Sequence, residues 1–345
     1  MNEHAFYMEK ALSLAQRGLG TTSPNPMVGA LLVKEGAVLG EGWHVRAGEG
    51  HAEVNAFADA AKKGNSVEGA TLYVTLEPCS TYGRTPPCTE AILASGVKKV
   101  VIGCLDPNPK HAGRAVKILE DAGIEVIFNV LEKACCTLNE AFFHWITTSK
   151  PFVLLKLAQT LDGKIACFNG NSKWITSSEA RLRVMELRMW ADAVLTGGNT
   201  FRTDHPSFTA RDRDGNTLKT PKRFVVTMDP EGMKKLSPPG ENWEFVSLPR
   251  TEDWERFLLE LGRKNVTSVL LECGGRLAAS ALAAKAVNRV EFHIAPMILG
   301  GEKSVPSVGG TSPATLEEAW KLTETEYKMY GKDLAVTGLV EYGGK

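Results

Sequence analysis

The 345-residue sequence has no excess of either charge, no long apolar run and no internal repeat. Forty basic residues balance forty acidic ones, so no net positive field would hold a polyanion, and we expect no nucleic-acid partner. No segment approaches the roughly 20 apolar residues that a membrane span needs, and residues 1–10 carry acidic side chains without an apolar stretch. We therefore expect a cytoplasmic protein with no membrane partner.

Cysteine is scarce, and its seven positions form an odd set in a large chain without a signal-like segment. This pattern argues against a disulfide framework and for reduced thiols, some of which could bind metal. Apolar residues make up 43% and charged residues 23% of the chain, as in ordinary globular proteins. A chain of this length exceeds what one core usually serves, so we expect two domains.

Strand-like and helix-like segments alternate along both halves, which predicts α/β domains. The polar stretch 147–151 ends in a proline and predicts a boundary, giving domains over residues 1–147 and 148–345. The first domain is expected to contain strands over 27–33, 37–40, 71–75 and 98–103 and helices over 4–17, 51–61, 88–94, 112–122 and 131–145. The second is expected to contain strands over 152–157, 193–196, 224–227 and 269–272, helices over 179–190 and 276–284, and a hairpin within 322–342.

The most specific pattern in the first half combines one histidine and two cysteines. His51, Cys79 and Cys88 supply one imidazole and two thiolates, a donor set that zinc accepts while keeping a fourth position for water. Glu53 lies two residues beyond His51, where a carboxylate can take a proton from that water and pass it to leaving ammonia. The pattern predicts a zinc-dependent deaminase of a nitrogen heterocycle.

Two features qualify this interpretation. A structural zinc site closed by Cys104 as a fourth ligand is the alternative, although three ligands favour catalysis. Eight residues, 80–87, separate the two cysteines where zinc deaminases usually have two. The inserted segment carries Arg84, which we expect over the metal pocket, where it would suit a phosphate or a polar heterocycle.

The second half lacks a Gly-x-Gly-x-x-Gly motif after a strand, so a Rossmann nucleotide site is not indicated. Glycine pairs at 197–198 and 274–275 each follow a strand and precede a helix. They are either tight turns or places where backbone amides hold a phosphate. Lys156 lies within an apolar strand, where it either extends to solvent or serves a site, and we favour the site.

Several motifs closely resemble the bifunctional riboflavin-biosynthesis deaminase/reductase family almost from end to end. In the first half they lie at 22–29, 42–44, 51–53, 77–80, 83–88 and 106–109, and in the second at 156–158, 161–164, 172–176, 198–200 and 272–275. The resemblance implies a cytidine-deaminase-like three-layer α/β/α domain followed by a dihydrofolate-reductase-like α/β domain. It also implies Zn2+ and NADPH as cofactors and a small phosphorylated pyrimidine as substrate. A homo-oligomer is compatible with it.

The same resemblance assigns residues to the two sites. Substrate contacts in the first domain would be Asn25, His44, Arg84 and Asn108, and in the second Ser172, Arg188, Phe208, Arg211 and Glu272, alongside Lys156. Cofactor contacts would be Ala158, Trp174, Thr200, Asp204, Gly274, Gly275, Arg276, Leu277, Ala278, Ala279 and Ser280. The sequence departs from the family at Thr81, where His is common, at Ala115, where Gly is common, and in the strand segment 222–229.

Two other interpretations compete with this one. The first is a nucleoside or tRNA deaminase fused to an unrelated reductase, which the cysteine spacing and the balanced charge oppose. The second is a degenerate scaffold that keeps the folds without the chemistry, which the intact His51, Glu53, Cys79 and Cys88 oppose.

Overall fold

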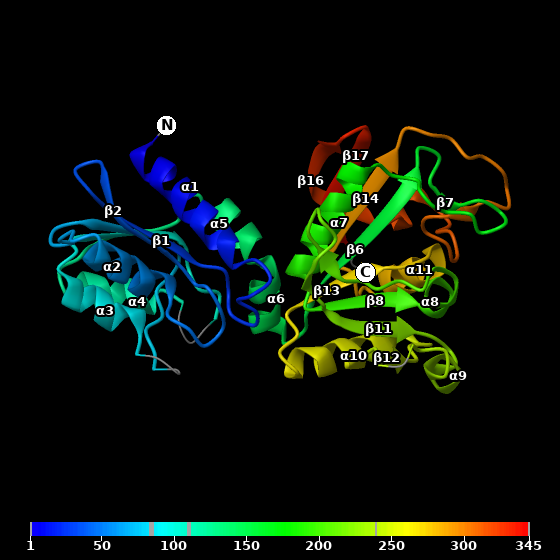
Figure 1. Ribbon diagram of the computed structural model, residues 1–345, viewed down its shortest axis with the longest axis horizontal. Helices are drawn as coiled ribbons and strands as arrows, with labels where there is room; N and C mark the ends of the chain where they lie inside the picture. The colour runs from blue at the N-terminus through cyan, green and yellow to red at the C-terminus, as the bar shows by residue number, and fades with distance from the viewer. Residues whose placement is uncertain (1, 83–85, 109–111, 239, 344–345) are drawn as a thin grey trace. The chain divides into compact units, whose positions relative to one another are not determined.

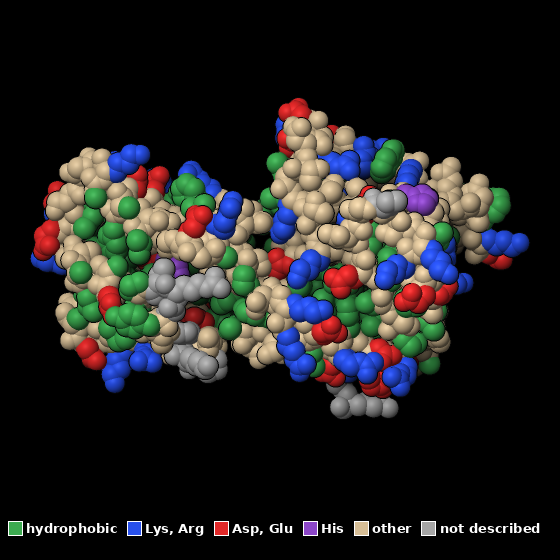
Figure 2. Space-filling view, turned by 60° about the horizontal axis from the view of Figure 1, so that its bottom comes forward, with side chains coloured by type: hydrophobic (Ala, Val, Ile, Leu, Met, Phe, Trp, Pro, Cys, Tyr) green, Lys and Arg blue, Asp and Glu red, His purple; other side chains and the backbone are tan. Residues whose placement is uncertain are grey.

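The computed structural model describes residues 2–82, 86–108, 112–238 and 240–343. The chain divides into two compact units, Met1–Ser149 (unit 1) and Lys150–Lys345 (unit 2). None of the helices in the described ranges combines the length and apolarity that crossing a membrane requires. On the face shown in Figure 2, basic side chains lie among acidic ones and form no continuous basic surface.

Unit 1 contains a five-stranded sheet in the order β2-β1-β3-β4-β5. Strand β1 pairs antiparallel with β2 and β3, whereas β3, β4 and β5 run parallel. The carboxyl ends of β3 and β4 therefore meet at one edge of the sheet. The strands are β1 Gly29–Lys34, β2 Ala37–Trp43, β3 Thr71–Leu76, β4 Lys99–Cys104 and β5 Glu125–Ile127.

Helices cover both faces of this sheet and give three layers (Figure 1). Helices α2, α3 and α4 bury Ala56, Ile92 and Leu119 against one face, and α1 and α5 bury Met8 and Cys135 against the other. The helices are α1 Glu3–Ala15, α2 Ala52–Lys62, α3 Cys88–Ser95, α4 Arg114–Asp121, α5 Glu132–Leu138 and α6 Glu140–Thr148, and a 3-10 turn spans Gln16–Gly18.

Close packing fixes the first turn of α2 against β2. A Cβ atom on Gly42 would lie 2.3 Å from the carbonyl oxygen of Ala52, so only glycine permits this approach.

The expected single helix over 131–145 is wrong: this segment forms two helices that meet at Asn139. The side chain of Asn139 hydrogen-bonds both backbone groups of Met27, and the residue leaves the helical conformation at φ −114°.

Unit 2 contains an eight-stranded sheet in the order β12-β11-β8-β13-β6-β14-β17-β16. Six strands are parallel, and β17 pairs antiparallel with β14 and β16, so the hairpin expected within 322–342 is confirmed. The strands are β6 Phe152–Thr160, β8 Ala193–Gly197, β11 Lys222–Val226, β12 Trp243–Val246, β13 Ser268–Glu272, β14 Arg289–Ala295, β16 Lys321–Tyr330 and β17 Asp333–Glu341. Two short pairs are β7 Lys164–Ala166 with β15 Val305–Pro306, and β9 Ala210–Arg211 with β10 Thr217–Lys219.

The two faces of this sheet differ in chemistry. Helices α10 and α11 bury Trp254, Phe257 and Leu282 against an apolar face. Helix α7 lies on the opposite face, where Leu187 packs on the sheet and charged side chains of β6, β13 and β14 also point. The helices are α7 Ser178–Trp190, α8 Gly198–Asp204, α9 Pro230–Lys234, α10 Thr251–Arg263 and α11 Gly275–Ala283, with a 3-10 turn at Leu316–Glu318.

Candidate active sites

Three elements of unit 1 bring His51, Cys79 and Cys88 together. His51 immediately precedes α2, Cys79 follows β3, and Cys88 is the first residue of α3. Their ligand atoms all lie within 4.8 Å of one another. The Nδ1 atom of His51 lies 3.1 Å from Sγ of Cys88 and 3.5 Å from Sγ of Cys79, so Nδ1 is the nitrogen that faces the sulfurs.

The two thiol groups influence each other's ionisation. The hydrogen bond with Cys88 lowers the pKa of Cys79 to about 4 and raises the pKa of Cys88. The backbone N–H of Cys88 also donates to Sγ of Cys79 at 3.2 Å, at the positive end of α3. A dication would stabilise both thiolates, so the donor set fits zinc.

Cys104 does not join this group among the described residues. It ends β4, is buried beside Cys135, and donates its thiol hydrogen to the carbonyl oxygen of Thr75 at 3.4 Å. The alternative of a structural site closed by Cys104 is therefore wrong for this structure. A three-ligand group leaves a coordination position for water, as catalytic zinc sites do.

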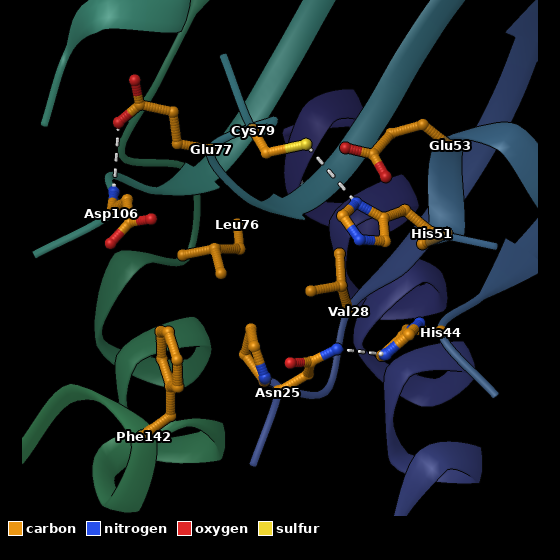
Figure 3. A pocket seen from close by; sticks show the side chains of 12 residues that line it. Asn25, Val28, His44, His51, Glu53, Leu76, Glu77, Cys79, Asp106 and Phe142 are labelled. Atoms are coloured by element: carbon orange, nitrogen blue, oxygen red, sulfur yellow. Dashed lines mark hydrogen bonds between the residues drawn. The ribbon is translucent and has the colours of Figure 1, made fainter. Parts of the chain in front are cut away.

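Glu53 lies in the first turn of α2 and is only 3% exposed. Its carboxylate points toward the His51 ring and the Cys79 sulfur (Figure 3). Burial raises the pKa of Glu53 above its ordinary value. A carboxylate with a raised pKa beside the metal position is suited to accept and return a proton.

A pocket of about 190 Å³ opens beside this group, and Asn25 and His44 line it. His44 Nδ1 faces the carbonyl oxygen of Gly50 at 3.1 Å, and Nε2 lies 3.1 Å from Nδ2 of Asn25. Burial lowers the pKa of His44, which keeps the ring neutral with its proton on Nδ1. Nε2 then accepts from Asn25, and this fixes the orientation of the Asn25 amide (Figure 3).

Two other residues expected in the first site are not among the described residues that line this pocket. Arg84 lies outside the described residues. Asn108 does not line the described pocket, and its backbone N–H donates to Asp106 at 2.8 Å. Phe142 and Glu77 also line the pocket, although neither was expected from the sequence to be a site residue. Phe142 comes from α6 and could have been suspected only as an aromatic residue on a predicted helix.

Two adjoining hollows of about 740 and 770 Å³ lie above the α7-facing side of the unit 2 sheet and share several walls. They bring together most of the residues expected in the reductase site. The expected cofactor contacts among them are Ala158, Trp174, Thr200, Asp204 and Gly274, and the expected substrate contacts are Lys156, Ser172, Arg188, Phe208, Arg211 and Glu272.

The remaining expected cofactor contacts, residues 275–280, do not line these hollows. They form the start of α11, where Ala278 is buried against the apolar face and Ala279 is buried too. A Cβ atom on Gly275 would lie 2.3 Å from the carbonyl oxygen of Pro306, so this helix start is packed against another segment. Ser280 accepts a hydrogen bond from the Trp254 indole at 3.2 Å.

Hydrogen bonds within the protein hold two arginines of the second site in place. Arg188 donates to both carboxylate oxygens of Glu272, at 2.7 and 2.9 Å, and to the carbonyl oxygen of Thr209 at 3.2 Å. Arg211 is exposed and donates to the hydroxyls of Thr209 and Ser207. Within the described part of the chain, the Lys156 ammonium forms no hydrogen bond or close ion pair, although it lines both hollows.

Comparison with known families agrees with this division. The cytidine and deoxycytidylate deaminase zinc-binding region matches residues 1–104, and the RibD C-terminal domain matches residues 151–336. The riboflavin biosynthesis protein RibD of Actinobacillus pleuropneumoniae is 38% identical, covering 97% of this chain and 94% of its own. That of Aquifex aeolicus is 40% identical, covering 96% of each.

The chain belongs to the RibD family. A solved deaminase/reductase from Thermotoga maritima superposes with a TM-score of 0.85 at 35% identity, covering 98% of each chain. Acinetobacter baumannii RibD superposes with a TM-score of 0.82 at 34% identity, covering 98% of this chain and 99% of that one. Unit 1 thus has the cytidine-deaminase-like fold and unit 2 the dihydrofolate-reductase-like fold of this family. The protein is a bifunctional deaminase and reductase of riboflavin biosynthesis.

Proposed function

We propose that the chain catalyses two successive reactions on one phosphorylated pyrimidine. The first is hydrolytic deamination of 2,5-diamino-6-(5-phosphoribosylamino)pyrimidin-4-one, and the second is NADPH-dependent reduction of the ribosyl side chain to ribityl. The observation that carries the proposal is the three-ligand group beside buried Glu53 in a chain that also contains a reductase unit. The Thermotoga maritima relative is described as a diaminohydroxyphosphoribosylaminopyrimidine deaminase/5-amino-6-(5-phosphoribosylamino)uracil reductase, which names the same pair of reactions.

In the first reaction, His51, Cys79 and Cys88 would hold zinc. When bound, zinc lowers the pKa of water so that it can attack the ring carbon that carries the amino group. The Asn25 amide, oriented by His44, would hydrogen-bond the polar edge of the pyrimidine, and Phe142 would provide an apolar wall for its ring. Arg84 remains a proposed contact of the phosphate or the heterocycle, and Asn108 a proposed contact of the substrate.

Glu53 would move the proton that the reaction requires. Deamination exchanges an amino group for an oxygen, so the attacking water must lose two protons, of which one goes to the leaving amine to make ammonia and the other to a ring nitrogen. Glu53 is the buried carboxylate that lies against the ligand group, and its raised pKa favours a group that alternates between its two protonation states. We assign Glu53 as the proton carrier.

In the second reaction, a bound nicotinamide would supply the hydride. Ala158, Trp174, Thr200, Asp204 and the 274–280 segment are the proposed cofactor contacts. The proposed substrate contacts are Lys156, Ser172, Arg188, Phe208, Arg211 and Glu272. Among these, the Lys156 ammonium lines both hollows and has no hydrogen-bond partner within the described part of the chain, so it would donate to an oxygen of the sugar in its charged form.

A coupled assay tests the proposal. Purified protein is given the phosphorylated diaminopyrimidine, and ammonia release and NADPH oxidation are followed on the same sample. We expect ammonia first and cofactor oxidation second, with no ammonia from free cytidine. Deamination of cytidine with no action on the phosphorylated pyrimidine would favour the nucleoside-deaminase alternative. If the protein catalysed neither deamination nor NADPH oxidation, the scaffold alternative would be favoured.

A further inference from the structure

Lys156 lies between two glutamates on the α7-facing side of the unit 2 sheet. Strand β6 is flanked by β13 and β14, and both pairings are parallel. In register, Lys156 is opposite Glu272 on β13 and opposite Glu291 on β14. Residues aligned in neighbouring strands point to the same face, so the three side chains form one row across the sheet.

Two arginines of α7 cover the glutamates at the ends of this row. Arg188 binds both oxygens of Glu272, and Arg183 binds both oxygens of Glu291 through Nε at 3.1 Å and an η nitrogen at 3.0 Å. Such two-point pairs fix the position and the orientation of a carboxylate. The row therefore alternates in sign, with the Lys156 ammonium at its centre.

Glu291 differs from Glu272 because it does not line either hollow and its side chain is only 5% exposed. It lies 2.8 Å from Nε2 of His293, whose Nδ1 is buried and has no hydrogen-bond partner among the described residues. Burial lowers the pKa of His293, so the ring is neutral and donates from Nε2. Glu291 thus accepts three hydrogen bonds without touching the space where a ligand would bind.

These contacts keep Glu291 ionised. Burial alone would raise the pKa of Glu291, but the hydrogen bonds from His293 and Arg183 lower it to about 2. For Lys156, burial lowers the pKa, and the nearby Arg188 lowers it too. The carboxylates of Glu272, Glu291 and Asp333 raise it. The charge of Lys156 therefore depends on the carboxylates of Glu272 and Glu291 on the two neighbouring strands and of Asp333 on β17.

We infer that Glu291, held by Arg183 and His293, is a positioning residue of the reductase that keeps the Lys156 ammonium charged beneath the substrate. This inference rests on the proposed function of Lys156. Arginines hold both glutamates, but Glu272 also lines the hollows and can contact a ligand there, whereas Glu291 does not line them. The two glutamates therefore have different roles. Glu272 can contact substrate, and Glu291 supplies a constant negative charge next to Lys156 on the neighbouring strand.

The inference predicts shifts of opposite sign in two variants. The pH dependence of kcat/KM for NADPH oxidation is measured with the deaminated intermediate supplied, so that unit 1 plays no part. Glu291→Gln removes the anion next to Lys156. The apparent pKa of the alkaline limb of the kcat/KM profile should therefore fall by about one pH unit or more. Arg183→Gln frees Glu291 from its guanidinium partner, and the same limb should move up.

Glu186→Gln is the matched control, because exposed Glu186 binds the same arginine at 3.1 Å on its outer side. Its profile should match that of the unaltered protein. A purely structural role for Glu291 would lower activity at every pH in both variants without moving the limb, and that result would overturn the inference. If Glu291→Gln does not fold, as judged by thermal melting, an unmoved limb in Arg183→Gln would overturn it equally.

Lys156→Met separates this inference from the proposed function. We expect this variant to lose NADPH oxidation while it retains ammonia release. If it reduces the intermediate normally, the role of Lys156 is wrong and the role of Glu291 fails with it. If it is inactive but neither Glu291→Gln nor Arg183→Gln shifts the alkaline limb, Lys156 keeps its role and only the inference about Glu291 is overturned.

Discussion

The side-chain amide of Asn139 pairs with the backbone of Met27 in both directions. Met27 N donates to Oδ1 of Asn139 at 2.8 Å, and Nδ2 of Asn139 donates to the carbonyl oxygen of Met27 at 2.8 Å. Asn139 separates α5 from α6, and Met27 follows the turn that carries Asn25. Asn139 therefore lies at the junction of two helices, and its side chain anchors the chain segment that forms a wall of the deaminase pocket.

Asn139→Ala should weaken both the fold and the binding of the deaminase substrate. It removes two hydrogen bonds and leaves both Met27 backbone groups unpaired, which should lower the free energy of unfolding of unit 1 by about 2–3 kcal/mol. Release of the turn should raise KM for ammonia release more than it lowers kcat. Thermal melting and steady-state kinetics check this. Asn139→Asp, which keeps an acceptor for Met27 N, should show a smaller effect, and an unchanged KM in the alanine variant would contradict the anchoring role.

Cys79→Ser and Cys104→Ser should separate the metal group from the neighbouring core. A hydroxyl is a poor zinc donor in place of a thiolate, so the Cys79 variant should lose zinc and ammonia release together. The Cys104 variant should keep about one zinc per chain, because its thiol hydrogen-bonds Thr75 and lies outside the ligand group. Metal analysis of both purified variants provides the measurement. Zinc loss in the Cys104 variant would reinstate the four-ligand alternative.

Glu53→Gln should stop deamination without releasing the metal. The amide keeps the shape of the carboxylate but cannot carry a proton, so kcat for ammonia release should fall by about a hundredfold to ten-thousandfold. Zinc content, thermal melting and NADPH oxidation with supplied deaminated intermediate should remain near normal. Glu49→Gln, an exposed carboxylate on the approach to α2, is the control and should leave all four quantities unchanged. Loss of reduction in the Glu53 variant would indicate coupled sites.

The metal group could be predicted from the sequence because short motifs contain its ligands and the neighbouring carboxylate. His51 and Glu53 are two residues apart, and donor type alone restricts what His51, Cys79 and Cys88 can bind. Phe142 and Asn139 could not be assigned in this way. Asn139 contacts Met27, which lies 112 residues earlier, and only the tertiary fold brings α6 to the pocket.

Strand β14 was not among the expected strands, and the burial of its polar face could not have been predicted from its sequence pattern. Its sequence alternates, but the positions that face α7 are Glu291 and His293, which are polar and also buried. The usual rule takes the polar face of a strand as the exposed one. Here Arg183 covers the polar face from a helix more than 100 residues earlier in the chain, so the pattern indicates a solvent-exposed face that does not exist.

The stability of unit 2 should show a component that depends on Glu291 at acidic pH. Its pKa is about 2 in the folded chain against an ordinary value of 4.5, so the folded state favours the ionised form. The stabilisation is therefore fully present above about pH 4.5, decreases as the pH falls, and is lost near pH 2. A shift of this size corresponds to about 3 kcal/mol for a group so fully buried.

Glu291→Gln should remove this component. The variant should be less stable than the unaltered protein at pH 7, and the difference between the two should shrink as the pH falls from about 4.5 toward 2. Urea unfolding of unit 2, followed by tryptophan fluorescence at several pH values, measures the difference directly. Glu186→Gln should track the unaltered protein, because exposed ion pairs contribute little. A constant difference between Glu291→Gln and the unaltered protein across this range would show that Glu291 is not held in its ionised form by Arg183 and His293.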